Sequence, residues 1–220
     1  MTGNEMLATL GLRLEDPSAS SFTATAKLDA LNIAQRTVVN LVHNAYLGEL
    51  QAVVANTGMT ANTLAYSVLT AASGGGQPIR NGIIAVKDNP GNGGSAKWAT
   101  MIEPGNQKRL ENTYLAGSDT NPVAYFFGEK IYVDGLGATN AIDVWYLRQP
   151  VAIAANTTEC ELNIALHEIV IDLAESQLWK MDAKMERAAA ASASATGQIT
   201  ALNARYPAEA PSGIGTKNRL

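Results

Sequence analysis

The sequence contains few charged residues. Asp, Glu, Lys and Arg make up 16% of the 220 residues, against about 25% in an average globular domain. The net charge is −4 and the isoelectric point is about 5.2, which argues against non-specific binding to nucleic acid or anionic membranes as the main task. The polar positions are largely Asn, Thr, Ser, Gln and Gly, and such a surface suits extensive contact between proteins.

Cysteine and histidine are almost absent. The single Cys160 excludes an internal disulfide and a Cys-based zinc site, and it is most simply a small apolar residue near a helix start. The only histidines are His43 and His167. His167-Glu168 could begin an H-E-x-x-H zinc motif, but Ile171 occupies the position of the second histidine.

Long apolar runs and targeting signals are also missing. No stretch approaches the roughly 18 apolar residues of a membrane span, and the N-terminus lacks the pattern of a secretory signal. We therefore expect a protein that is made and kept in a cytoplasm-like compartment, unless it travels inside an assembly.

Motifs of common enzyme sites are missing as well. The glycine runs 74–76 and 93–94 are not followed by Lys-Ser or Lys-Thr, and neither opens a periodic helix, so they are not phosphate loops. No Gly-x-Ser-x-Gly elbow occurs, and the spacing suggests no Ser/His/Asp set. The sequence predicts no catalytic residue, no metal site and no cofactor, and we expect that the protein is not an enzyme.

The first long helix is predicted from about Thr23 to Ala55, and either Ser21 or Thr23 could cap it. It follows a short helix within Met1–Leu14. A helix of roughly 33 residues is long against a mean of about 11–12. Because Ile33 and Leu47 fall on its otherwise polar side, this helix should make apolar contacts in more than one direction.

The strongest helix signal begins at Thr158. Thr158 and Glu161 match a capping box, and neither Pro nor Gly follows until Gly197. A helix from Thr158 to about Met185 would be roughly 40 Å long, and the alanine-rich run 188–196 could continue it.

The predicted helix from Thr158 carries two apolar stripes and one acidic face. Leu178, Met181 and Met185 lie on the second stripe, and with Ile33 and Leu47 they are candidates for a subunit interface. The acidic face is either a solvated surface or the lining of a lumen, and its carboxylates are too spread out to converge on one metal ion. This acidic ridge comprises Glu161, Glu168, Asp172, Glu175, Asp182 and Glu186.

The region between the long helices is predicted to be rich in β-structure. Glycines interrupt short strand-like pieces in 56–121, and a three-stranded meander with a II′ turn at Gly128-Glu129 follows. Its aromatic side chains could form a stacking platform, but core packing is the simpler interpretation because no basic stripe accompanies them. The predicted strands are Ala65–Thr70, Ile79–Lys87, Lys97–Ile102, Val123–Phe127, Lys130–Asp134 and Ala141–Leu147.

These patterns predict an α+β fold. Residues 1–55 and 151–206 would form one discontinuous domain, a bundle of two long helices and the short N-terminal helix. Residues 56–150 would form the β-rich insert with its antiparallel meander. Residues 207–220 have the composition of an unfolded segment and would form an extended C-terminal tail.

The order of these elements resembles a known family. The segments that carry the resemblance are Glu5–Pro17, Leu28–Gln35, Leu41–Leu47, Tyr125–Val133, Ile142–Leu147, Glu161–Glu168 and Asp172–Trp179. Together they span nearly the whole chain and are similar to the head-to-tail adaptor proteins of tailed bacteriophages, also called connector or head-completion proteins.

The resemblance implies a structural virion protein, made in the host bacterial cytoplasm and located in the phage neck. Such adaptors form a ring, commonly of twelve subunits, that binds the portal protein above and a tail or nozzle protein below. Double-stranded DNA passes through the channel without sequence-specific binding, and an acidic lining would keep its phosphates from sticking. In this family an extended terminal segment often docks onto the portal. Here that role would fall on the tail, with Pro207, Pro211, Ile214, Arg219 and Leu220 as candidates.

Two alternatives remain open from the sequence. One is another virion ring component, such as a tail, nozzle or head-stopper protein. The other is a small-ligand-binding or enzymatic domain that uses the aromatic residues of the meander.

Overall fold

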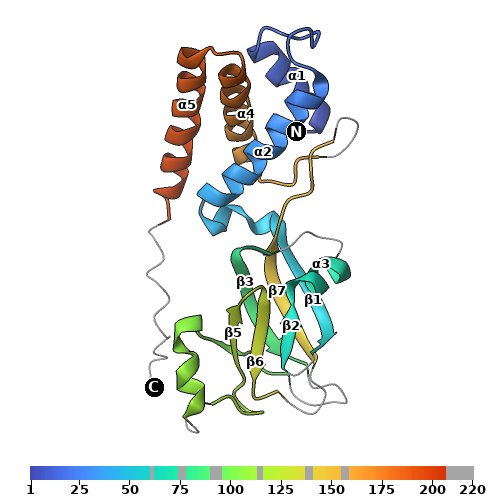
Figure 1. Ribbon diagram of the computed structural model, residues 1–220, viewed down its shortest axis with the longest axis vertical. Helices are drawn as coiled ribbons and strands as arrows, with labels where there is room; N and C mark the ends of the chain where they lie inside the picture. Colours follow the sequence, from blue (N-terminus) through green and yellow to red (C-terminus); the bar gives the residue numbers. More distant parts are fainter. Residues whose placement is uncertain are drawn as a thin grey trace. The chain divides into compact units, whose positions relative to one another are not determined.

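The computed structural model describes residues 1–59, 62–73, 78–89, 96–112, 116–136, 141–154 and 159–206. The protein has an α+β fold and divides into two compact units. We call the first, Met1–Leu50 with the described residues from Pro150 onward, the helical unit. We call the second, Gln51–Gln149, the β unit (Figure 1).

The short N-terminal helix is present as α1, Gly3–Arg13. It begins with a capping box: the Thr2 hydroxyl accepts from the Glu5 amide, and the Glu5 carboxylate accepts from the Thr2 amide. Met6 and Leu10 are fully buried because they lie on the same face of the helix, four residues apart.

The first long helix is shorter than predicted. Helix α2 spans Ala24–Leu41 and is capped by the Thr23 hydroxyl, so a helix continuing to Ala55 is wrong. The side chain of Asn203 caps the C-terminal end of α2. Its amide group donates to the Leu41 carbonyl at 2.9 Å, and its oxygen accepts from the His43 amide at 2.8 Å. Two 3₁₀ turns follow, Asn44–Tyr46 and Gly48–Leu50.

The predicted C-terminal long helix is two helices. Thr158 lies outside the described residues, and Glu161, which is not helical, accepts a hydrogen bond from the Val151 amide at 2.8 Å. The helical turns begin after Asn163, whose side chain accepts from the amide two residues on. The chain reverses at Ala183, which has a positive φ of 57°. The elements are a 3₁₀ turn at Ile164–Leu166, α4 at His167–Met181 and α5 at Met185–Asn203.

Helix α4 is central in the helical unit. It packs against α1, α2 and α5, and Figure 1 shows it between α5 and the other two helices. Burying one Leu or Ile side chain contributes about 1.5–3 kcal/mol, so this shared apolar contact is the main source of stability for the unit. The fully buried side chains include Leu31, Val38, Leu166, Ile169, Val170 and Leu178.

The β unit contains two sheets. The first has the order β1-β7-β3 with antiparallel pairs, and the second has the order β2-β6-β5-β4, in which β4 and β5 are parallel. The strands are β1 Gln51–Gly58, β2 Thr63–Ala65, β3 Pro78–Asp88, β4 Thr100–Met101, β5 Val123–Phe127, β6 Lys130–Asp134 and β7 Ala141–Arg148. Two helical segments accompany them, α3 at Tyr66–Ser73 and a 3₁₀ segment at Pro104–Glu111.

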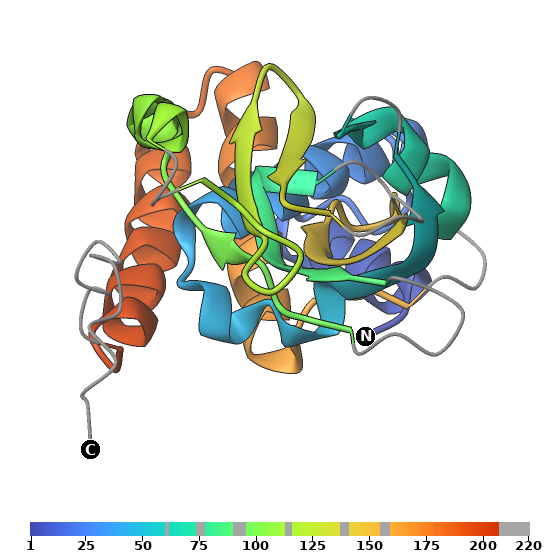
Figure 2. The ribbon, with the colours of Figure 1, turned by 90° about the horizontal axis from the view of Figure 1, so that it is seen from below.

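The predicted three-stranded meander is wrong, although its strands exist. β5 and β6 form the predicted hairpin, but β7 pairs with β1 and β3 in the other sheet (Figures 1 and 2). The hairpin turn also differs, because Gly128 and Glu129 have positive φ angles of 57° and 59°, the I′ rather than the II′ pattern. The segment predicted as a strand at Ala65–Thr70 is mostly α3, and that at Lys97–Ile102 is reduced to β4.

The core of the β unit lies between the inner faces of its two sheets. Tyr146 and Leu69 are fully buried there, and the Tyr146 hydroxyl donates to the Leu69 carbonyl at 3.3 Å. Of the predicted aromatic set, Tyr146 is therefore core. Tyr125 and Tyr132 are half-buried and stack on each other, with ring centroids 4.9 Å apart.

Candidate functional site

The structure separates the five residues predicted to form a subunit interface. Leu47 and Leu178 are fully buried within the chain, so placing them at a subunit interface is wrong. Ile33, Met181 and Met185 are 46%, 73% and 61% exposed. The difference arises because α4 ends at Met181, so that Leu178 still faces the helical core while the two methionines flank the reversal of the chain.

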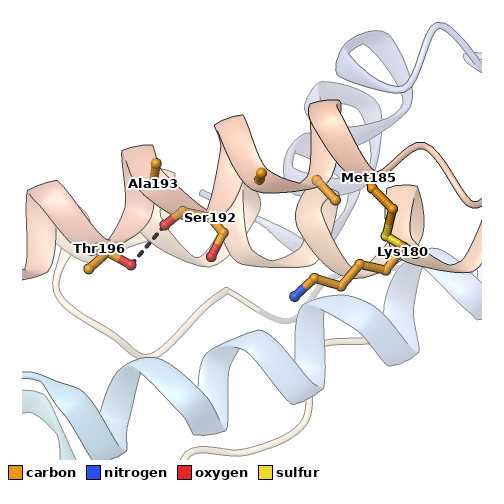
Figure 3. A pocket seen from close by; sticks show the side chains of 7 residues that line it. Lys180, Met185, Ser192, Ala193 and Thr196 are labelled. Carbon is orange, nitrogen blue, oxygen red and sulfur yellow. Dashed lines mark hydrogen bonds between the residues drawn. The ribbon is translucent and has the colours of Figure 1, made fainter.

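A shallow groove runs along α4 and α5 beside Met185 (Figure 3). Its volume is about 650 Å³. In Figure 3 Met185 lies at one end, Thr196 at the other, and the Lys180 side chain extends into the space beside α5. The small side chains would let a second polypeptide approach the backbone of α5 closely. The lining residues are Lys180, Met185, Ala188, Ala189, Ser192, Ala193 and Thr196.

The acidic ridge is not a continuous exposed surface, because Asp172 is buried while Glu168 and Asp182 are exposed; a lumen lining by its exposed members stays a prediction. The Asp172 side chain is only 7% exposed and accepts hydrogen bonds from Ser194 at 2.7 Å and Gln198 at 2.9 Å. Glu161 lies before α4 and Glu186 lies on α5. The six carboxylates do not form one surface because they come from separate elements, and three of them, Glu168, Asp172 and Glu175, contact Arg13.

One cation from α1 binds three members of the ridge. The Arg13 guanidinium contacts Asp172 through Nη1 and Glu168 through Nη2, and Nη1 lies 3.6 Å from Glu175. Glu175 also accepts from the Trp179 indole N–H at 3.1 Å. This cluster ties α1 to α4, and its bonds to Ser194 and Gln198 tie both to α5. Its role is structural.

A second buried charge pair holds the loop between α1 and α2. Asp16 and Lys27 are both 3% exposed, and Lys27 Nζ lies 3.2 Å from Asp16 Oδ2. The Asp16 carboxylate accepts from the amides of Phe22, Ser20 and Ser21 at 2.9, 2.7 and 3.1 Å. The bond from Phe22 is the largest of the causes that hold the pKa of Asp16 far below its usual range.

His167 is a buried titratable group at the start of α4. Its Nε2 lies 2.8 Å from the Leu162 carbonyl, and its Nδ1 lies 3.0 Å from the Met1 nitrogen. A carbonyl only accepts and the Met1 nitrogen donates, so the neutral ring satisfies both contacts and the protonated ring satisfies only one. Burial, more than the nearby positive charge of Met1, lowers the pKa of His167.

We expect His167 to make the protein less stable as the pH falls. The unfolded chain takes up a proton near pH 6.5 while the folded chain resists it, so the free energy of unfolding should fall below that pH, with a slope approaching about 1.4 kcal/mol per pH unit. Denaturant unfolding between pH 7.5 and 5.5, followed by circular dichroism, measures the slope.

Two variants separate His167 from other titrating groups. His167→Gln keeps one donor and one acceptor without titrating, and it should flatten the pH dependence. His43→Gln should leave it unchanged, because His43 is outside the buried network. An unaltered slope in His167→Gln would rule out this role.

Within the described ranges, no group of three or more His, Cys, Asp or Glu residues is arranged to hold a metal ion. None of the helices described is both long and apolar enough to cross a membrane. The tail residues predicted to dock onto the portal, Pro207, Pro211, Ile214, Arg219 and Leu220, lie outside the described residues.

Sequence reasoning missed several contacts that build the helical unit. The capping box at Thr2 and Glu5 was visible as a Thr-x-x-Glu pattern. The Ser-rich loop after Asp16 also signalled local hydrogen bonding. The partners of Arg13 carried no local signal, because they lie more than 150 residues away.

Comparison with known proteins adds no identification. No protein-family model matches this sequence, and a search of curated proteins finds no match.

Proposed function

We propose that this protein is a structural ring component of the neck of a tailed bacteriophage, joining the portal to the tail around the DNA channel. The observation that carries the proposal is that the helical unit exposes large apolar side chains on separate elements. Ile33 is exposed on α2, and Met181 and Met185 are exposed where α4 meets α5. A ring needs two different, complementary surfaces on each subunit.

The surface at the α4–α5 reversal supports a protein partner in particular. Met181 and Met185 are unbranched and adaptable side chains of the type found at protein-binding surfaces. Beside them lies the groove of small residues, in which Lys180 is the only charged side chain. A groove of this composition offers packing area to a neighbouring subunit but few polar groups to orient a small molecule.

The tail 207–220 completes the proposal. Three residues separate it from the end of α5, and it contains two prolines and three glycines or serines, a composition that favours an extended segment over a packed one. We assign it the portal contact, as the family resemblance implies.

A second candidate remains another ring component of the virion, such as a tail, nozzle or head-stopper protein, because the same surfaces would serve it. A ligand-binding domain is favoured only by the exposed aromatic group of the β unit. There Trp98 is 58% exposed and lies 4.7 Å from Trp145, centroid to centroid.

The proposal is tested by imaging. Electron microscopy of the purified full-length chain, alone and in phage necks, should show a closed ring located between portal and tail. A ring found elsewhere in the particle would favour the second candidate, and a chain that stays monomeric at all concentrations would contradict both. A chain ending at Tyr206 should still form rings but bind the portal more weakly.

The methionine surface has its own variant. Met181→Asp with Met185→Asp should weaken ring formation at least about tenfold, because two charges would be buried without partners. Phe127→Asp, at a side chain that is 62% exposed in the β unit, is the matched control and should leave assembly intact. Sedimentation velocity measures the ring fraction. Equal assembly of the two variants would remove the methionines from the interface.

A further inference from the structure

Strands β1 and β3 form the two edges of the sheet β1-β7-β3. Over part of its length, each of them is paired only with β7 among the residues described. Strand β1 bonds to β7 on one side. On its other side, no backbone hydrogen bond from β1 reaches any residue in the described ranges. Every second residue of an edge strand directs its N–H and C=O groups away from the sheet, so β1 presents a row of donors and acceptors that no residue in the described ranges uses.

Strand β1 has few of the features that normally prevent edge pairing. Natural edge strands are protected by charges, prolines, β-bulges or covering segments, and the only irregularity in the pairing of β1 with β7 lies between Val54 and Thr57, so that Gln51–Val54 is regular. β1 reads Gln-Ala-Val-Val-Ala-Asn-Thr-Gly and contains neither a charged residue nor a proline. It is eight residues long, above the usual five to six, and the Val53 side chain is 50% exposed. Such an edge favours pairing with another chain.

Strand β3 provides the opposite edge. Its end is covered, because Ala99 donates to the Val86 carbonyl at 2.9 Å and Asp88 donates to the Lys97 carbonyl at 2.7 Å. The stretch Ile83–Ala85, where the register against β7 shifts at Ile84, has no such partner among the residues described, and Ile84 is 47% exposed.

The two open stretches lie at the same level of the sheet. Trp145 of β7 is paired with Val53 of β1 on one side and with Ala85 of β3 on the other. The next residue, Tyr146, is likewise paired with residues of both strands. A neighbouring copy could therefore meet β1 with its β3 edge without a large shift along the strands.

We propose that β1 of one subunit pairs with the Ile83–Ala85 stretch of β3 in the next subunit, so that the sheet continues from copy to copy. The proposal rests on the proposed ring and identifies a part of its subunit contact. One β1–β3 contact satisfies both open edges at once and buries Val53 and Ile84. Pairing of β1 with β1 would instead form an isolated pair of subunits and leave β3 uncovered. Only the head-to-tail arrangement closes a ring.

Hydrogen exchange on the full-length chain tests the pairing directly. In rings, compared with dilute monomer, amide exchange in 51–58 and 83–85 should slow about tenfold or more. Exchange in 167–176, the part of α4 that lies before the exposed Met181, should not change. Rings in which the β1 amides are not protected would overturn the pairing and leave the proposed ring standing. Failure of the wild-type chain to form rings would contradict both.

Charged variants of the two edges give an independent test. Val53→Lys with Ala55→Lys should block the β1 edge, and Ile84→Lys should block the β3 edge, so each variant alone should stay monomeric. The side chains of Val53, Ala55 and Ile84 are all exposed, and circular dichroism would verify that both variants fold. Val68→Lys on α3, at a side chain that is 39% exposed, is the control and should assemble normally.

Mixing the two edge variants gives the sharpest result. The β1-blocked chain keeps its β3 edge, and the β3-blocked chain keeps its β1 edge. Together they should form one intact contact and sediment as a heterodimer that does not grow further. Rings from either variant alone, or no heterodimer on mixing, would overturn the proposal.

Discussion

Replacing Lys27 by Met should lower the melting temperature of the helical unit by about 10 °C or more. Lys27 Nζ lies 3.2 Å from Asp16 Oδ2, and both side chains are almost fully buried. The substitution removes the cation and leaves the Asp16 carboxylate inside the protein. An ionised group that loses its partner in this way is strongly destabilising.

The loss should reach beyond the ion pair itself. Asp16 also accepts the amide hydrogen bonds that shape the loop between α1 and α2. The Lys27 ammonium also donates to the backbone carbonyl of Asp16 at 2.5 Å. Its removal therefore leaves both the carboxylate and the carbonyl of Asp16 without this donor. We therefore expect α1 to become susceptible to proteolysis at temperatures where the wild-type chain resists it.

Lys184→Met is the matched control. Lys184 forms a 2.7 Å ion pair with Asp182, but both side chains are close to half exposed, and such surface pairs contribute little to stability. Differential scanning calorimetry would measure both variants. A shift in Lys27→Met no larger than that in Lys184→Met would show that the buried pair does not stabilise this loop.

Replacing Arg13 by Met should lower the free energy of unfolding by about 3 kcal/mol. Arg13 is the cation that offsets Glu168, Asp172 and Glu175. Asp172 is the decisive partner, because its side chain is only 7% exposed. Without the guanidinium, three carboxylates would remain close together, one of them buried, and α1 would lose its charged link to α4.

Arg13→Lys should give an intermediate loss. A lysine keeps the charge but lacks the two-pronged guanidinium that contacts Asp172 and Glu168 at the same time. Arg36→Met on the exposed side of α2 is the control and should change stability by less than about 0.5 kcal/mol. Urea unfolding measures all three variants. If Arg13→Met stays within that same small range, the cluster contributes nothing to the fold.

Local features of the fold could be predicted from the sequence. The α2 start at Thr23, the hairpin β5–β6 and the strand β7 follow from capping chemistry, a turn dipeptide and short-range alternation. These signals act within a few residues, so they need no knowledge of the rest of the chain. The α+β fold class follows from them.

The ends of the long helices could not be predicted in the same way. The residue that caps the end of α2 is Asn203, which is 162 residues away from Leu41 in the sequence. The reversal between α4 and α5 places Ala183 in a conformation that alanine itself does not favour, and packing of α5 against α4 holds it there. Both breaks occur where a tertiary contact overrides a good local helix pattern.

The sequence alone determined the chemistry of the surface: little charge, no catalytic motif, and apolar residues on more than one side of its helices. The tertiary structure decided which of those residues are exposed. Leu47 and Leu178 are part of the core, whereas Met181 and Met185 are at the surface. Three carboxylates of the acidic ridge bind Arg13. The tertiary structure also moved β7 out of the predicted meander. Helix periodicity gives the directions of side chains around one axis, but burial depends on which elements pack together, and those pairings join residues far apart in the chain.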